Sequence, residues 1–199
     1  MIEHLFKKVC ESEDLYISII ERKENTLSVI VKRIYIYFTR FNCNKIESDR
    51  YVNSRYYLIR LAKRIGIYNN FNYCFSHAGK YSAVLVSSKL DHMSVDIEPI
   101  NRHLTGSLRL RIRELFPCLK IPEIMVILIL ESLVKLTIFY PSVNLSKILT
   151  NFQAINITEL RESVFEVSVN NVMVFSKIYT YSGLYICITL QTKQFDLIL

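Results

Sequence analysis

Residues 93–98 read MSVDIE, directly after a second apolar segment at 84–86. Both segments have the composition and length of β-strands. Successive side chains of an extended chain point to opposite faces, so Asp96 and Glu98 share one face, with β-carbons roughly 7 Å apart. The apolar residues of the same strand share the other face. The pattern therefore predicts a strand that packs on a core and carries two neighbouring carboxylates.

Residues 124–140 are nearly all apolar, which predicts a long helix buried on most of its sides. Its few polar positions include Glu131 and Lys135, which are four residues apart and so lie on one helical face. A polar stripe on a buried helix needs partners. The alternative is a Glu-to-Lys pair on a solvent-exposed face, which stabilises a helix by about 0.3–0.5 kcal/mol.

Three carboxylates in two apolar segments suggest a metal site. Carboxylates side by side on a strand repel each other, and a divalent cation removes this repulsion. Mg²⁺ prefers one or two carboxylates together with phosphate oxygens and water. We therefore expect Asp96, Glu98 and Glu131 to hold Mg²⁺ beside a phosphate bound by Lys135. For the strand alone, the alternative is an exposed acidic face of an ordinary half-buried strand.

Ser76 and His77 stand before a small-residue turn at 78–80. Both side chains can donate hydrogen bonds to a phosphate. The alternative is a capping serine beside a histidine with no role in binding. We keep both residues as candidates for phosphate binding, with Lys80 as a further candidate.

Three motifs in order resemble the 4′-phosphopantetheinyl transferases of the surfactin-synthetase-activating type: residues 75–79 (FSHAG), 94–98 (SVDIE) and 127–135 (ILILESLVK). The resemblance covers residues 48–190. It implies an α+β fold of two similar α/β halves in a pseudo-twofold arrangement, with coenzyme A between the halves. In this chain the halves correspond to residues 1–70 and to residues 71–199, which carry the metal site.

The resemblance also implies an activity, the Mg²⁺-dependent transfer of the 4′-phosphopantetheine arm of coenzyme A to a serine of an acyl or peptidyl carrier protein, with nonribosomal peptide synthesis as the favoured pathway. It assigns the metal to Asp96, Glu98 and Glu131, with Glu131 as the catalytic base. The residues expected to bind coenzyme A are Arg50, Ser76, His77 and Lys135. The arginines of a helix expected at 101–115 are candidates for docking the carrier protein.

The chain departs from the family pattern at several positions. Ser94 stands where the family has glycine, Leu130 where it has a lysine, and Ile127 where it has an aromatic residue. A Gly-Lys-Pro segment that helps to hold coenzyme A is missing before Phe71. These departures leave open a relative that binds coenzyme A or a carrier protein without catalysing transfer. A metal-dependent phosphohydrolase using the same carboxylates is a further alternative.

The chain has 199 residues, of which 51% are hydrophobic, and a formal net charge of +7. This length suits one or two small domains with a sizeable core. The positive charge favours acidic partners, and coenzyme A with an acidic carrier protein satisfies it. A basic nucleic-acid-binding module is the alternative, but the basic residues form no run and no nucleic-acid motif is present.

Five widely spaced cysteines without a C-x-x-C pair indicate reduced thiols rather than a zinc site. The N-terminal residues lack the charge and apolar pattern of a signal peptide, and the longest apolar run, 124–130, is too short to span a membrane. We expect a cytoplasmic monomer that does not enter the membrane. Further strands are predicted at 26–31, at 34–38 and within 163–190, with a turn at Gly183, and a helix at 48–65.

Overall fold

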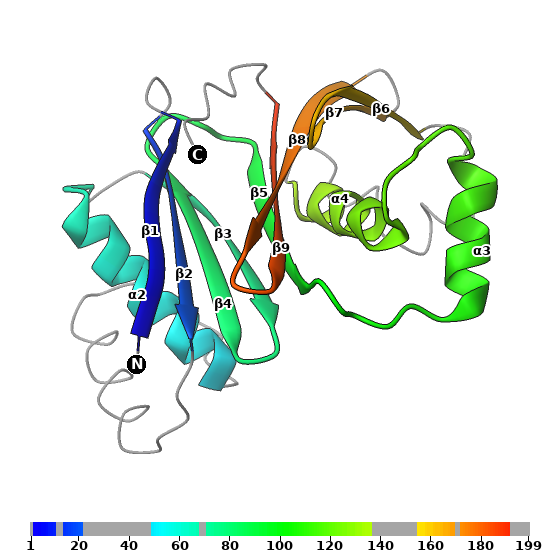
Figure 1. The fold of residues 1–199 in the computed structure, drawn as a ribbon. Helices are drawn as coiled ribbons and strands as arrows, with labels where there is room; N and C mark the ends of the chain where they lie inside the picture. Colours follow the sequence, from blue (N-terminus) through cyan, green and yellow to red (C-terminus); the bar gives the residue numbers. More distant parts are fainter. Residues whose placement is uncertain are drawn as a thin grey trace. The chain divides into compact units, whose positions relative to one another are not determined.

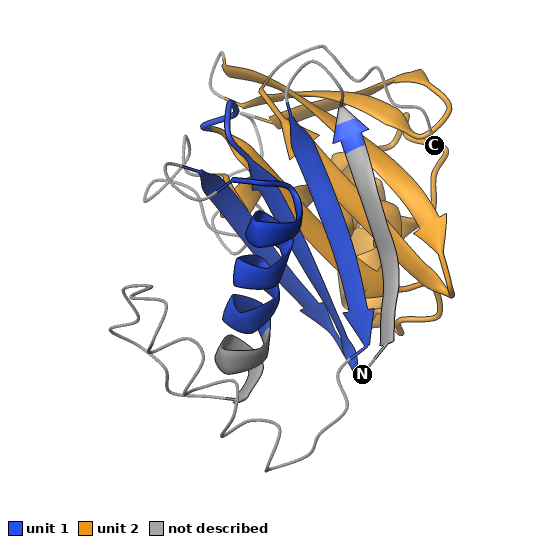
Figure 2. Cartoon of the chain, turned by 90° about the vertical axis from the view of Figure 1, so that its left-hand side faces the viewer, with its two compact units in different colours: residues 1–91, 197–199 blue, residues 92–196 orange. Residues whose placement is uncertain are grey.

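The computed structural model describes residues 2–10, 14–21, 49–67, 71–136, 155–169 and 172–191, with backbone alone for residues 2–8, 10 and 49–53. The chain divides into two compact units (Figure 2). Unit 1 comprises residues 1–91 with 197–199, and unit 2 comprises residues 92–196. This division lies further along the chain than the boundary predicted at residue 70, because residues 81–87 pair with the N-terminal strand at 15–21, and residues 72–78 pair with 81–87.

Unit 1 is an antiparallel sheet with one described helix packed on it (Figure 1). The strand order is β1-β2-β4-β3, so β3 lies at an edge. The elements are β1 (Ile2–Cys10), β2 (Leu15–Glu21), α2 (Asp49–Arg64), β3 (Asn72–Ala78) and β4 (Tyr81–Ser87). Helix α2 confirms the helix predicted at 48–65. It buries Leu58 and Leu61 against Val84 and Val86 of β4.

Unit 2 is a five-stranded antiparallel sheet in the order β5-β9-β8-β7-β6, with two helices. Its strands are β5 (Met93–Pro99), β6 (Ile155–Arg161), β7 (Val164–Val169), β8 (Val172–Tyr181) and β9 (Leu184–Leu190). Its helices are α3 (Gly106–Leu115) and α4 (Glu123–Lys135). Helix α4 contacts β5 and β9, and Figure 1 shows it lying along this sheet.

A tight turn connects two strands of unit 2. Ser182 and Gly183 link β8 to β9 with φ values of 49° and 77°. Two successive positive φ angles are typical of the two-residue turn that matches the twist of antiparallel strands. The predicted turn at Gly183 is therefore confirmed, as are the strands predicted within 163–190.

Helix α4 is almost wholly buried because its apolar residues face both the sheet and the rest of the core. Val126 to Leu130 are each at most 1% exposed. The helix ends at Lys135, since Leu136 is extended and its amide bonds the carbonyl of Leu133 at 3.0 Å. The helix was predicted to continue through residue 140, and this is wrong at Leu136, which is extended. Residues 137–140 lie outside the described residues.

Helix α3 begins at Gly106, five residues later than predicted. Thr105 caps it by accepting a hydrogen bond from the Leu108 amide at 3.4 Å. Before it, the Arg102 amide bonds the Pro99 carbonyl at 3.0 Å and closes a turn. Arg102 therefore lies beside the end of β5 rather than on the outer face of a helix.

The chain is an α+β protein, as expected. Its two described sheets are antiparallel, and three helices occur in its described ranges. The strands predicted at 26–31 and 34–38 fall outside those ranges. None of the three helices combines the length and hydropathy needed to cross a membrane.

Candidate metal centre

Strand β5 positions two of the three predicted carboxylates. It is the edge strand of the unit 2 sheet and pairs only with β9 among the described strands, with Asp96 opposite Cys187 and Glu98 opposite Tyr185. Val95 and Ile97 are fully buried on the opposite face. The alternation read from the sequence is therefore confirmed, and it directs Asp96 and Glu98 to the same side of the strand.

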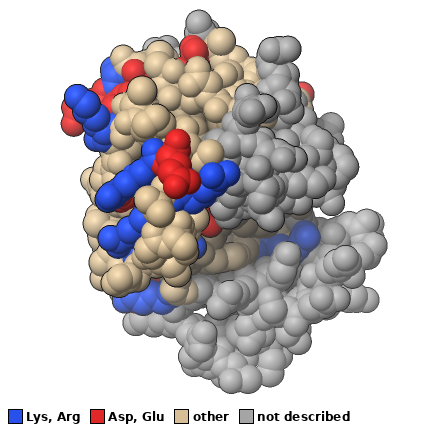
Figure 3. All heavy atoms as spheres, turned by 90° about the vertical axis from the view of Figure 1, so that its right-hand side faces the viewer, with Lys and Arg blue, Asp and Glu red and all other residues tan. Residues whose placement is uncertain are grey.

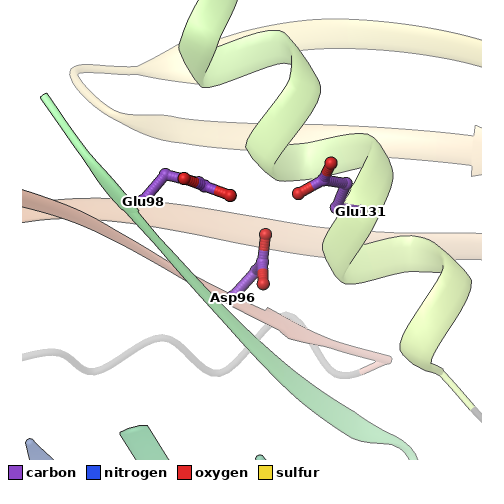
Figure 4. Close-up of side chains that lie close together, drawn as sticks. All are labelled: Asp96, Glu98 and Glu131. Carbon is purple, nitrogen blue, oxygen red and sulfur yellow. The ribbon is translucent and has the colours of Figure 1, made fainter. Parts of the chain in front are cut away.

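Helix α4 supplies the third carboxylate. Figure 4 shows Asp96 and Glu98 projecting from β5 toward Glu131 on the facing side of α4. One carboxylate oxygen from each residue lies within 4.8 Å of the others. The side chains become less buried from Asp96, at 5% exposed, through Glu98, at 17%, to Glu131, at 24%. The three predicted ligands thus form one cluster at the surface of the unit 2 core.

Close packing of these carboxylates changes their acidity. Burial raises the pKa of Glu131 to about 7, and the charge of Asp96 and a hydrogen bond with it add to the effect. Burial also raises the pKa of Glu98, against the opposing charge of Arg102. Ionised carboxylates at this separation repel each other, so a proton or another cation is retained.

Two basic side chains enter the cluster. Lys135, one helical turn after Glu131, forms an ion pair with Asp96 and donates to the Val95 carbonyl at 3.3 Å. Arg102 forms an ion pair with Glu98, and the same Nη1 atom lies 3.5 Å from Glu131 Oε2. With all three carboxylates ionised, these two cations leave one negative charge uncompensated.

The donor set suits Mg²⁺, which binds oxygen ligands at about 2.1 Å in an octahedron. Neighbouring and opposite oxygens of such an octahedron are about 3 and 4 Å apart. The oxygens of Asp96, Glu98 and Glu131 already lie within 4.8 Å of one another. These three residues would hold the ion if Arg102 Nη1 moved away from Glu98 and Glu131.

Of the residues predicted to bind phosphate, Lys135 lies in unit 2, and the others lie in unit 1. His77 is on β3, where its Nε2 is 3.1 Å from Ser54 Oγ of α2 and its Nδ1 is 2.9 Å from Ser82 Oγ of β4. Both nitrogens of the ring therefore already have hydrogen-bond partners. Ser76 is 3% exposed, and Lys80 forms an ion pair with Glu21 at 2.5 Å. Arg50 lies near the start of α2, and its side chain is outside the described part of the structure.

Sequence reasoning missed two groups of polar residues at this centre. Arg102 was expected on an outer helical face, although its spacing of four from Glu98 is a signal for a pair. A row of buried hydroxyls that includes Ser94 and Ser132 lies beside the carboxylates. The signal for this row is the presence of serine and threonine in strands and a helix that are otherwise apolar.

Cys187 lies on β9 beside the carboxylates. Its side chain is fully buried, and burial raises the pKa of its thiol to about 12. A thiol that stays protonated at neutral pH is a poor nucleophile, so Cys187 is poorly suited to nucleophilic chemistry.

Charged residues on the α3 side of unit 2 are mixed in sign. Arg111 pairs with Glu114 at 3.3 Å, and Arg113 pairs with Glu123 at 2.5 Å. Figure 3 shows Lys and Arg side chains next to Asp and Glu side chains on this face. The described part of this face therefore carries charges of both signs.

Comparison with known proteins adds no assignment, since the sequence matches no protein-family model and is significantly similar to no curated protein.

Proposed function

We propose that the chain is a divergent 4′-phosphopantetheinyl transferase of the surfactin-synthetase-activating type. The observation that carries this proposal is the convergence of Asp96, Glu98 and Glu131, whose oxygens lie within 4.8 Å of one another. They come from the two motifs whose order and spacing resemble that family. The proposal includes the pseudo-twofold relation of two α/β halves and a coenzyme A site that uses Arg50 and His77.

In the proposed reaction, the serine hydroxyl of a carrier protein attacks the coenzyme A pyrophosphate at the phosphorus attached to pantetheine. A new P–O bond forms to the serine, the bridging P–O bond breaks, and adenosine 3′,5′-bisphosphate leaves. A bound Mg²⁺ supplies charge neutralisation for the pyrophosphate. The roles of this chain are to hold the ion through Asp96, Glu98 and Glu131, to orient the phosphates and to accept the serine proton.

Glu131 is the residue suited to accept that proton. A general base must lie within reach of the proton that it accepts, and the Glu131 carboxylate is the most exposed of the three, at 24%. Lys135 forms an ion pair with Asp96, so in this proposal it contributes to phosphate binding only in addition to that ion pair.

A second candidate function is favoured by the position of Arg102. Its guanidinium pairs with Glu98 and approaches Glu131, so it competes with a metal ion for the same oxygens. Together with the missing Gly-Lys-Pro segment, this arrangement supports a relative that binds coenzyme A or a carrier protein without transferring the arm. The carboxylate cluster is then a structural ion network.

The test is the intact mass of a promiscuous carrier protein after incubation with the full chain, coenzyme A and Mg²⁺. The transferase predicts a gain of one phosphopantetheine group, which is lost in Asp96→Asn and Glu131→Gln. Glu159→Gln, at an exposed position of β6, is the matched control and retains the gain.

A calorimetric titration of coenzyme A into the chain separates the remaining outcomes. Binding without any mass gain on several carriers supports the impaired relative. Absence of both binding and transfer refutes the family-based proposal. Release of adenosine phosphates without a carrier indicates a phosphohydrolase, and salt-sensitive binding of DNA or RNA indicates a nucleic-acid-binding module.

A further inference from the structure

A row of fully buried polar side chains crosses the core of unit 2 beside the carboxylates. Its members come from four elements, and each is 0% exposed: Ser94 of β5, Ser132 of α4, Cys187 and Thr189 of β9, and Ser176 of β8. Strand pairing explains part of the row, since Thr189 lies opposite Ser94 on one side and opposite Ser176 on the other. The row therefore runs across three neighbouring strands on the side that α4 covers.

Short polar contacts connect the row from end to end. Ser94 Oγ lies 2.8 Å from Ser132 Oγ, and Ser132 donates to Thr189 Oγ1 at 2.8 Å. Thr189 Oγ1 lies 2.8 Å from Ser176 Oγ and 3.7 Å from Cys187 Sγ. Each hydroxyl thus has a partner, as buried polar groups require.

The row also fixes the end of helix α4. Carbonyl groups in the last turn of a helix have no amide further along the helix to bond them. Ser94 Oγ donates to one of these, the carbonyl oxygen of Ser132, at 2.8 Å. The bond joins the backbone of α4 to β5, on which Ser94 is two residues from Asp96. On α4 its acceptor belongs to Ser132, the residue that follows Glu131.

Apolar residues of similar size fill such a core at lower cost, because an unsatisfied buried hydroxyl costs about 1–3 kcal/mol. Connected polar groups instead define one arrangement of the packed elements, since any sliding breaks several hydrogen bonds together. Here the elements are α4 and β5, and their relative position sets the separation of Glu131 from Asp96.

We propose that Ser94, Ser132 and Thr189 are positioning residues of the carboxylate centre. They hold α4 at one height along β5, and so keep Glu131 within ligand distance of Asp96 and Glu98. Their importance for catalysis rests on the proposed function. Their role in placing Glu131 does not, and it can be measured without a metal or a substrate.

The first experiment uses the isosteric pair Thr189→Val and Thr189→Ser in the full chain. Valine keeps the shape and removes the hydroxyl, whereas serine keeps the hydroxyl. Binding of Mn²⁺ alone is followed by the electron paramagnetic resonance of the free ion. Thr189→Val is expected to weaken binding about 10-fold, the size typical of residues that orient metal ligands, and Thr189→Ser is expected to bind like the unmodified chain.

Ser87→Ala is the control for loss of a buried hydroxyl elsewhere. Ser87 lies on β4 in unit 1, where its Oγ accepts hydrogen bonds from the amides of Lys89 and Leu90 at 3.0 Å. This variant is expected to lower the melting temperature and to leave Mn²⁺ binding unchanged. Lowered stability alone is thereby separated from loss of positioning.

The second readout is the crystal structure of each variant without metal. In Thr189→Val the Glu131 oxygens are expected to lie more than 4.8 Å from those of Asp96 and Glu98, whereas Thr189→Ser keeps them within that distance. Ser94→Ala provides the same comparison if Thr189→Val does not fold.

The two readouts separate the two proposals. If the unmodified chain does not bind Mn²⁺ but Glu131 moves away from Asp96 in Thr189→Val, positioning stands and the metal-dependent function is refuted. If Thr189→Val changes neither Mn²⁺ binding nor the distance between Glu131 and Asp96, positioning is overturned while the proposed function is unaffected.

Discussion

The ammonium group of Lys135 forms an ion pair with the carboxylate of Asp96, whose side chain is only 5% exposed. The sequence motif suggested that this lysine binds a phosphate. In the folded chain its first contribution is to neutralise a carboxylate that the core has largely removed from water. The pair also joins the end of α4 to β5.

Lys135→Met is therefore expected to lower the free energy of unfolding by about 3 kcal/mol, because it leaves a buried carboxylate without its cation. Unfolding in urea measures the change. Lys120→Met, at an exposed position outside the helices, is the control and is expected to stay within about 0.5 kcal/mol of the unmodified chain. Combining Lys135→Met with Asp96→Asn should recover part of the loss. A fully additive loss in the double variant contradicts the pairing.

The pKa of Glu131 predicts how stability depends on pH. This pKa is raised from 4.5 to about 7, so the folded chain binds more protons than the unfolded chain between these values. Stability is then fully present below about pH 4.5 and is lost as pH rises through about 7, by up to about 3 kcal/mol. The raised pKa of Glu98 acts in the same direction. Urea unfolding across this range should show the decline, and Glu131→Gln should reduce it. An equal slope in Glu131→Gln contradicts the assignment.

Magnesium is expected to stabilise the chain most where Glu131 is ionised. At ten times its dissociation constant, one bound ion adds about 1.4 kcal/mol, or roughly 3–6 °C in melting temperature for a chain of this size. The gain should appear at about pH 8 and shrink at about pH 5.5, where the Glu131 proton competes with the ion.

Asp96→Asn should abolish the magnesium effect, whereas Glu159→Gln, on the exposed side of β6, should retain it. Differential scanning fluorimetry with Mg²⁺ and with an equal ionic strength of NaCl measures both. An equal gain from the two salts shows that the cluster binds no metal.

Arg102→Gln is expected to lower the stability of the metal-free chain and to increase the stabilisation that magnesium gives. Loss of the guanidinium removes one of two cations from the cluster, which is expected to cost about 1 kcal/mol for this partly exposed pair. The same loss frees the oxygens of Glu98 and Glu131, so the melting temperature should gain more from Mg²⁺ than in the unmodified chain. Arg109→Gln on the exposed face of α3 is the control. A smaller gain in Arg102→Gln means that this arginine supports the metal rather than competing with it.

His77→Gln tests whether this residue holds α2 against the unit 1 sheet or binds a phosphate. Its ring joins Ser54 of α2 to Ser82 of β4, so the variant is expected to lose about 1 kcal/mol for these bonds. Calorimetric titration of coenzyme A provides the second measurement. Reduced stability with unchanged coenzyme A affinity assigns His77 a structural role, and reduced affinity with unchanged stability assigns it to the ligand.

Local patterns in the sequence predicted the carboxylate cluster well. Alternation in β5 placed Asp96 and Glu98 on one face, and helical spacing placed Glu131 one turn from Lys135. Such patterns depend on neighbours along the chain, which the sequence contains directly. They also predicted α2, the β7 to β9 strands and the turn at Gly183.

Partners distant in the sequence were not predictable in the same way. The contact of His77 with Ser54 depends on how α2 packs on the unit 1 sheet. Arg102 was assigned to a helix, because the cap at Thr105 that delays its start is a weak signal beside a basic, periodic segment. The division after Asp91 was missed because it depends on the pairing of β4 with β2.

The rate at which the buried thiol of Cys187 is alkylated reports how often the core of unit 2 opens. Its pKa of about 12 and its complete burial protect it from alkylation while unit 2 is closed, whereas Cys118, in the turn between α3 and α4, is exposed. An alkylating reagent therefore modifies Cys118 at once and Cys187 only when the sheet and α4 separate. The mass of the Cys187 peptide, followed over time, gives the rate of this opening. A proton or a metal ion that holds Glu131 near Asp96 is expected to slow the alkylation of Cys187.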